Sequence, residues 1–178
     1  MANGANLVWI DLEMSGLEPA EDVILEIATI VTRPDLSPVA EGPSLVIDQP
    51  DEVLEAMDEW NTRHHGESGL TDRVRQSNIT LEEAEEQTLE FLRDYVAPQS
   101  APLCGNSITQ DRRFLYRYMP KLSEFLHYSN IDVSSIKELV KRWYDGLEPP
   151  EKETRHRALD DIRESIDELR FYRNEVFV

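Results

Sequence analysis

The sequence predicts a mixed α/β fold in which a five-stranded sheet is flanked by helices. Three strand-like segments come first, joined by short links that contain glycine or proline. Two further short strands then alternate with helices whose apolar residues recur every three or four positions. The 178 residues show no repeat and no linker, so we expect residues 1–178 to form one domain.

The first three strands are predicted from runs of apolar and β-branched residues. They cover residues 7–12 (LVWIDL) and 24–31 (ILEIATIV), and a third lies within 44–48 (SLVID). The intervening segments are short, which favours hairpin-type links between these strands. Two more short strands are expected at residues 101–105 (APLCG) and 130–134 (NIDVS).

Four helices are predicted after the first strands. Thr80 and Glu83 have the spacing of a capping box at the start of a helix. In the other three, apolar residues form a stripe along one face. The predicted helical regions are 80–97, the second part of 105–119, 136–143 and most of 155–172, with a polar loop at 148–154 before the last.

The charge of the chain limits the partners that it can bind. It has 18 Lys and Arg against 36 Asp and Glu, a formal net charge of −18. Such a chain should repel long polyanions, so we expect no stable complex with long nucleic acid. An enzyme that grips one or two phosphates through bound metal is compatible with this charge.

The sequence also predicts a soluble protein of the cytoplasm. No apolar run is long enough to span a membrane, and the N-terminus lacks the basic start and the cleavage site of a secretory signal. Cys104 is the only cysteine, so no intrachain disulfide can form. A reducing compartment fits this composition.

Two acids interrupt the first strand near its carboxyl end. Asp11 and Glu13 are two residues apart, so on a strand they point to the same face. Carboxylates about 5 Å apart repel each other by roughly 3 kcal/mol at an effective dielectric constant near 20. Water, a proton, a base or a metal must offset that repulsion. A solvated strand end would also explain an isolated pair of this kind.

Further acids occur at the starts of two predicted helices. Asp111 lies three residues before Phe114, on the apolar face of its helix, although an acid there can also simply complement the helix dipole. In the last helix Asp161 lies nearer the apolar stripe than its neighbour Asp160. His156 precedes Asp161 by five residues, at the helix entrance or in the loop before it.

This set of residues has a chemical logic. Four carboxylates can hold two Mg²⁺ or Mn²⁺ ions, which are hard cations that prefer oxygen ligands. Two such ions can activate a water and stabilise the leaving oxygen of a phosphodiester, and a histidine can accept the proton of that water. The set predicts catalytic residues His156, Asp11, Glu13, Asp111 and Asp161, and the four acids would be the metal ligands.

These residues resemble those of the DEDDh exonucleases, which have a ribonuclease H-like fold. The resemblance extends over residues 9–165 through the blocks WIDLEMSGL, EIATIVT, MDEWN, GNSITQDRRFL, HYSNIDVSSIKEL and HRALDDIRES. The resemblance is closest to those members of the family that complete RNA decay. It implies a homodimeric 3′-to-5′ exoribonuclease that cleaves very short oligoribonucleotides, chiefly dinucleotides such as pGpG, to mononucleotides.

The resemblance also implies residues that bind the substrate. Leu17 would wedge against the bases, and Tyr128 would pack on the substrate of the partner subunit. Ser107 and Ser134 would help to bind the 5′ phosphate. Trp60, with the segment that follows it, would lie near the active site.

One position departs from the family pattern. Members usually have His-Tyr-Arg before the last strand, with the arginine reaching the 5′ phosphate across the dimer. Here the run is His127-Tyr128-Ser129, and a serine cannot supply a bidentate, charged contact to phosphate. We therefore expect weaker selection for a 5′ phosphate and for dinucleotides.

Two other functions remain open from the sequence. One is a DEDDh exonuclease that acts on longer RNA or DNA, although the chain lacks a basic stripe. The other is an acidic interaction protein or cation-binding protein without catalysis, although no EF-hand loop pattern occurs. Metal-dependent turnover of a dinucleotide distinguishes these possibilities.

Overall fold

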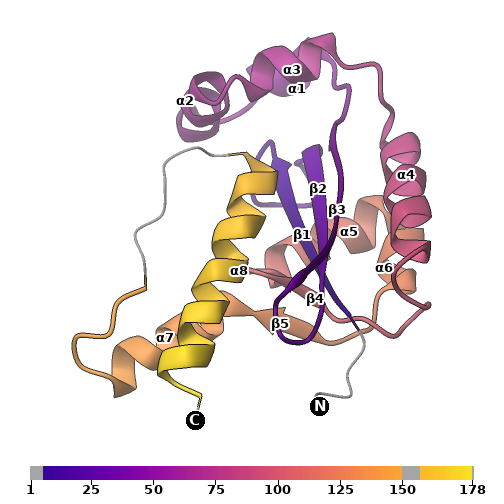
Figure 1. The fold of residues 1–178 in the computed structure, drawn as a ribbon. Helices are drawn as coiled ribbons and strands as arrows, with labels where there is room; N and C mark the ends of the chain where they lie inside the picture. The colour runs from indigo at the N-terminus through magenta and orange to yellow at the C-terminus, as the bar shows by residue number, and fades with distance from the viewer. Residues whose placement is uncertain (1–5, 150–156, 178) are drawn as a thin grey trace.

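A five-stranded mixed sheet forms the centre of the molecule (Figure 1). The computed structural model describes residues 6–149 and 157–177. The strand order is β3-β2-β1-β4-β5. The strands are β1 (Leu7–Met14), β2 (Ile24–Thr32), β3 (Pro38–Val46), β4 (Leu103–Gly105) and β5 (Asn130–Asp132).

The sheet has an antiparallel half and a parallel half. β1 pairs with β2 and β2 with β3 in antiparallel register, which confirms the hairpin-type links expected for the first three strands. β4 lies parallel to β1, and β5 lies parallel to β4. The carboxyl ends of β1, β4 and β5 therefore meet at the same edge of the sheet.

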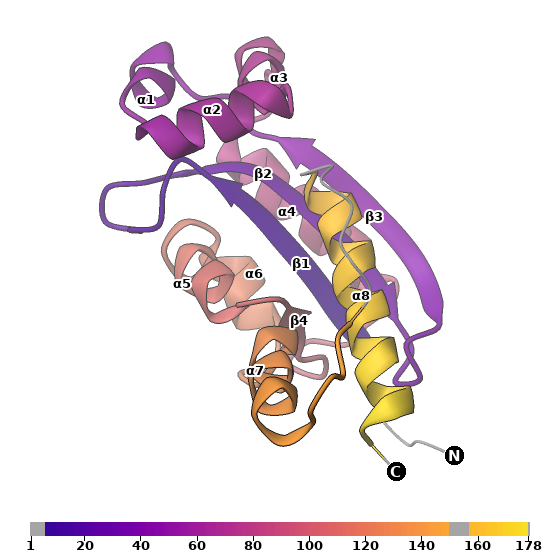
Figure 2. The ribbon, with the colours of Figure 1, turned by 90° about the vertical axis from the view of Figure 1, so that its left-hand side faces the viewer.

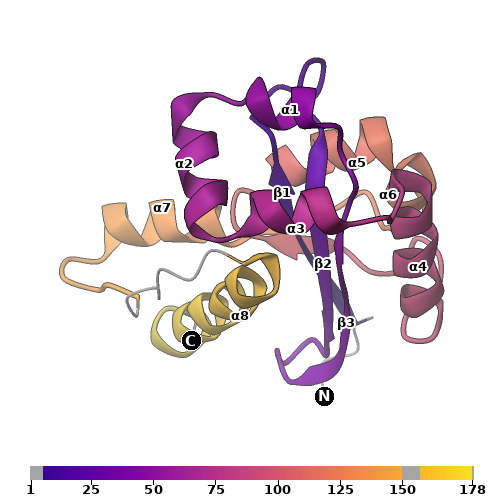
Figure 3. The same cartoon turned by 90° about the horizontal axis from the view of Figure 1, so that it is seen from above.

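Helices cover both faces of the sheet (Figures 2 and 3). Alternate residues of β1 point to opposite faces, so Val8 and Ile10 pack in one cluster of buried side chains while Trp9 packs in another. The first cluster includes side chains of α4 (Leu81–Arg93), α5 (Thr109–Tyr118) and α6 (Pro120–Phe125). The second includes side chains of α7 (Val133–Trp143) and α8 (Ala158–Glu175).

Three short helices lie beyond the carboxyl end of β1 (Figure 1). They are α1 (Asp51–Glu55), α2 (Glu59–Glu67) and α3 (Leu70–Gln76). Leu54, Met57, Leu70 and Val74 form a small third core with Leu25 of β2. This group of helices was not predicted from the sequence, and it forms a wall beside the strand end that carries the acids.

The strand ends differ from the prediction by one to several residues, and two of the differences have a clear structural reason. β3 begins at Pro38, whereas the predicted strand lay within residues 44–48. β3 is an edge strand, and edge strands tolerate proline and exposed polar residues, which in a sequence usually indicate the end of a strand. The last strand ends at Asp132, two residues before the expected end at 134. The side chain of Asp132 accepts the backbone N–H of Ser134 at 2.9 Å, so Asp132 caps α7 and the helix begins at Val133.

The predicted helices are present with modified ends. The capping box of α4 is confirmed, since Thr80 and Glu83 each accept the other's backbone N–H, at 3.2 and 2.8 Å. α6, at residues 120–125, was not predicted as a separate helix. Within the described ranges 6–149 and 157–177, no helix is both long and apolar enough to cross a membrane.

Candidate active site

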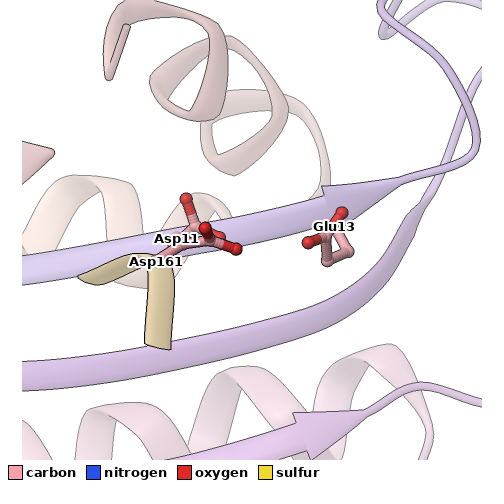
Figure 4. Close-up of side chains that lie close together, drawn as sticks. All are labelled: Asp11, Glu13 and Asp161. Carbon is pink, nitrogen blue, oxygen red and sulfur yellow. The ribbon is translucent and has the colours of Figure 1, made fainter. Parts of the chain in front are cut away.

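Three carboxylates meet where β1 ends and α8 begins (Figure 4). Each of Asp11, Glu13 and Asp161 contributes one carboxylate oxygen, and these three oxygens lie within 4.8 Å of one another. Asp11 and Glu13 share a face of β1 because they are two residues apart on the strand, and α8 covers that same face. The first turn of α8 brings Asp161 to them, as its place near the apolar stripe predicted.

Asp111 approaches the same strand from α5. It is buried in the first turn of that helix, and its Oδ1 accepts the backbone N–H of Leu12 at 3.0 Å. The expected inward position of Asp111 is thus confirmed. The negative charge of Asp111 contributes to raising the pKa of Asp11. Its oxygens are not part of the group formed by Asp11, Glu13 and Asp161.

The acids hold protons unusually strongly. Burial raises the pKa of Asp11 well above its usual value, and the neighbouring Asp111, Glu13 and Asp161 raise it further. The pKa of Glu13 is raised to about 8, first by burial and then by the charge of Asp161. Burial also raises the pKa of Asp111 to about 7, against the opposing effect of its bond to Leu12.

These residues fit divalent metal ions. A set made only of carboxylate oxygens suits hard cations such as Mg²⁺ and Mn²⁺. A bound cation would also relieve the mutual repulsion that raises the pKa values of Asp11 and Glu13. A divalent metal ion bound at this site would therefore offset the repulsion between Asp11 and Glu13, as expected from the sequence.

One predicted site residue cannot be placed. His156 lies outside the described residues, which resume at Arg157. Asp160 points away from the carboxylate group, as expected, and binds Arg163 at 2.7 Å on the surface of α8.

His65 lies beside the acids, a position that was not predicted from its sequence spacing. Its Nε2 is 2.9 Å from the backbone oxygen of Met14, and its Nδ1 is 3.9 Å from Oε2 of Glu13. The ring is almost completely buried, and burial lowers the pKa of His65. The only signal in the sequence was its place in the segment after Trp60, which was expected near the site.

A buried ion pair lies next to Glu13. Glu26 of β2 is directly opposite Glu13 in the sheet. Arg73 of α3 donates to both carboxylate oxygens of Glu26, at 2.9 and 3.2 Å, and Ser44 donates to one of them at 2.8 Å. This ion pair between Glu26 and Arg73 was not predicted from the sequence.

Ser107 and Ser134 lie together at the same sheet edge. Ser107 follows β4 and Ser134 follows β5. Their hydroxyl oxygens are 3.2 Å apart, and the backbone N–H of Ser107 donates to Oγ of Ser134 and to Oδ1 of Asp132 at 3.0 Å. These bonds hold Ser107 at a φ of 50°, in the left-handed region.

The three remaining predicted residues are exposed large side chains. The exposed fractions are 71% for Leu17, 57% for Trp60 and 87% for Tyr128. The backbone oxygen of Leu17 accepts from Gln110, in the helix that carries Asp111. Trp60 stacks on His64, with ring centres 4.5 Å apart. Tyr128 packs on His127 and borders a surface hollow of about 820 Å³.

Comparison with known sequences places this chain among exonucleases. The RNase_T family model, described as Exonuclease, matches residues 8–169. An oligoribonuclease of Pseudomonas paraeruginosa is 61% identical over 175 residues, which are 98% of this chain and 97% of the relative. An oligoribonuclease of Marinobacter nauticus is 59% identical over 178 residues and covers 99% of both chains.

Solved structures show the same fold. Exonuclease I from Methylocaldum szegediense matches 97% of this chain with a TM-score of 0.69 at 20% identity. The E. coli exonuclease I structure with a dT13 oligonucleotide matches 95% with a TM-score of 0.73 at 13% identity. This chain spans 41% of the length of each of these chains. The likeness confirms the predicted ribonuclease H-like mixed α/β fold.

Proposed function

We propose that this chain, which belongs to the oligoribonuclease family of exonucleases, removes nucleotides from the 3′ end of short oligoribonucleotides. The observation that carries this function is the group formed by Asp11, Glu13 and Asp161, whose oxygens lie within 4.8 Å of one another. We propose that residues 1–178 act as one exonuclease domain.

Each acid has a role in this proposal. Asp11, Glu13 and Asp161 would ligate two Mg²⁺ or Mn²⁺ ions together with Asp111, which approaches Asp11 from the opposite helix layer. Bound there, the ions supply activation of a water and stabilisation of the leaving oxygen of the scissile phosphodiester. His156 would accept the proton of the attacking water.

The place of the serine pair supports a preference for very short substrates. Asp132 at the end of β5 is level with Gly105 of β4, and the register places both beside Ile10, the residue before Asp11. Neighbouring strands are about 4.8 Å apart, so the end of β5 lies roughly 10 Å across the sheet from the part of β1 that carries Asp11. Ser107 and Ser134 would bind the 5′ phosphate there while the scissile phosphate lies at the acids. A substrate held at both points leaves little room for additional nucleotides, and dinucleotides such as pGpG fit this arrangement.

The exposed apolar residues would hold the bases. Leu17 follows the β1 end that carries the acids, and Trp60 lies on α2, the helix that also carries His65 to Glu13. Exposed Leu and Trp side chains are suited to contact with the flat faces of bases.

We also propose that two chains form a homodimer. Tyr116 and Tyr128 are 78% and 87% exposed and border the same hollow, as does Arg112. Exposed aromatic and arginine side chains around a depression are typical of protein interfaces. Tyr128 would reach the substrate bound to the partner subunit. We place the enzyme in the cytoplasm, where its single buried Cys104 stays reduced.

Hydrolysis of a dinucleotide in the presence of Mg²⁺ or Mn²⁺ tests this function. We expect mononucleotide products with either metal, none with EDTA, and almost none with Asp11→Asn. A longer RNA labelled at its 5′ end should shorten from the 3′ end. Metal-independent cleavage, or cleavage within the chain, would contradict the proposal. No turnover of any RNA would instead favour a non-catalytic acidic protein.

A further inference from the structure

Glu168 is a buried acid that contacts the serine pair through another residue. Its side chain on α8 is only 4% exposed. Oε1 accepts the Tyr172 hydroxyl at 3.0 Å and lies 3.3 Å from Nζ of Lys137, on α7. Oε2 accepts Nδ2 of Asn106 at 3.2 Å. Glu168 therefore links two helices to the segment that follows β4.

The carboxylate determines which way the amide of Asn106 faces. A carboxylate accepts hydrogen bonds but cannot donate, so the NH₂ group of Asn106 must point toward Glu168. The amide oxygen then faces the opposite direction, where Oγ of Ser134 lies 3.5 Å away. Ser134 consequently has an acceptor for its hydroxyl hydrogen and keeps its lone pairs toward Ser107.

The orientation of Ser134 in turn fixes Ser107. Oγ of Ser134 accepts both the backbone N–H and the hydroxyl of Ser107, at 3.0 and 3.2 Å. These bonds hold Ser107 in a left-handed conformation that serine rarely adopts. A phosphate oxygen is an acceptor, so the Ser107 hydroxyl would rotate its hydrogen from Ser134 to the phosphate, while the Ser107 N–H keeps its bond to Ser134.

We propose that Glu168 is a positioning residue for 5′-phosphate recognition, acting through Asn106 on the hydroxyls of Ser134 and Ser107. This inference rests on the proposed role of the two serines. Lys137 contributes by holding the carboxylate and by adding positive charge three residues after Ser134, on the same face of α7.

The experiment compares two substrates that differ only at the 5′ end. kcat/KM is measured for a dinucleotide with and without its 5′ phosphate, and the ratio of the two values reports phosphate recognition. The variants are Glu168→Gln, Ser134→Ala and the double substitution. Lys141→Gln is the matched control, because Lys141 lies on the outer side of α7 and pairs with Glu138.

In Glu168→Gln the remaining carbonyl oxygen should face Lys137 and Tyr172, which are both donors. The NH₂ group then faces Asn106 and can bond to it only if the Asn106 amide turns over. Ser134 then faces a donor rather than an acceptor. We expect the ratio to fall about threefold to tenfold, mainly through KM, which corresponds to one neutral hydrogen bond. Ser134→Ala should lower the ratio by a similar factor, and the double variant should resemble Ser134→Ala alone. Lys141→Gln should leave the ratio unchanged.

Three results would overturn the role of Glu168. Equal losses with both substrates in Glu168→Gln would show a merely structural role and overturn it. An unchanged ratio in Glu168→Gln, with a lowered ratio in Ser134→Ala, would overturn it while the serine assignment stands. An unchanged ratio in Ser134→Ala would overturn both, although turnover of the dinucleotide itself would still support the exonuclease function.

A second variant covers the case in which Glu168→Gln does not fold. Tyr172→Phe removes one hydroxyl from the same carboxylate and keeps the buried ring in place. We expect a fall of the ratio by about twofold, within the range for one weakened hydrogen bond. A folded Tyr172→Phe protein with an unchanged ratio would overturn the proposal.

Discussion

Glu13 and Glu26 lie directly opposite each other on β1 and β2, and Arg73 holds only the second of them by a bidentate ion pair. Two negative charges side by side in a buried sheet would be costly if both were uncompensated. Arg73 neutralises Glu26 and leaves Glu13 with its carboxylate neighbours Asp11 and Asp161. The ion pair thus separates a structural acid, Glu26, from Glu13, which we propose binds metal.

Loss of Arg73 should therefore destabilise the protein. Arg73→Met leaves Glu26 buried without its cation, and we expect the free energy of unfolding to fall by about 3 kcal/mol, at the lower end for buried pairs because Arg73 is one-third exposed. Arg75→Met on the same helix removes an exposed pair with Asp51 and should cost less than about 1 kcal/mol. Urea unfolding measures both, and equal losses would contradict the assigned role of Arg73.

Metal binding should release protons near neutral pH. The pKa values of about 8 for Glu13 and about 7 for Asp111 mean that the metal-free site is partly protonated at pH 7. Metal affinity should increase with pH up to about 8 and then level off. Calorimetry in buffers with different ionisation enthalpies measures the released protons. Affinity that does not change between pH 6 and 9 would contradict these assignments.

The same shifts set the pH dependence of stability without metal. The folded pKa of Glu13 is raised above its ordinary value of 4.5, so the folded protein binds more protons than the unfolded chain between pH 4.5 and about 8. The contribution of Glu13 to the free energy of unfolding therefore falls as pH rises through that range. Thermal unfolding with EDTA should show this fall, and added Mg²⁺ should reverse it.

Substitution of Asp161 should separate stability from activity. Asp161→Asn removes one repelling charge, so we expect a more stable metal-free protein but a loss of dinucleotide hydrolysis by about 10³-fold, comparable to losing one charge-stabilising group elsewhere. Asp160→Asn is the matched control, since Asp160 faces outward and binds Arg163. It should leave activity within about twofold. Similar losses of activity in both variants would refute the placement of the site.

Introduction of an arginine at position 129 should strengthen selection for a 5′ phosphate. A charged hydrogen bond contributes about 1.5–3 kcal/mol, so Ser129→Arg should favour phosphorylated over unphosphorylated dinucleotides by a further factor of about 10–100. The ratio of kcat/KM values for the two substrates measures the change. The same preference in both proteins would exclude a phosphate contact from this position.

Much of this site could be predicted because its signals are local. The spacing of Asp11 and Glu13 on a strand places them on one face, and the apolar stripe of the last helix places Asp161 rather than Asp160 inward. The capping box at Thr80 likewise needs only neighbouring residues. The fold class followed from the order of these local elements.

The remaining features depend on contacts between distant residues. His65 reaches Glu13 only because α2 crosses the end of β1, and Arg73 meets Glu26 from 47 positions away. The helices that carry these side chains are short and mostly polar, so their apolar periodicity is weak. The early start of β3 was missed because an edge strand lacks the apolar alternation of the central strands.

The dependence of the hydrolysis rate on RNA length would show directly whether this enzyme prefers dinucleotides. RNA of two, four, seven and twenty nucleotides, labelled at the 5′ end, would be incubated with Mn²⁺, with EDTA, and with the Asp11→Ala variant. We predict rapid, Mn²⁺-dependent loss of the dinucleotide, slow loss of the twenty-nucleotide RNA, and no loss with EDTA or the variant. Equal rates at all four lengths would contradict this prediction and would indicate a general exonuclease.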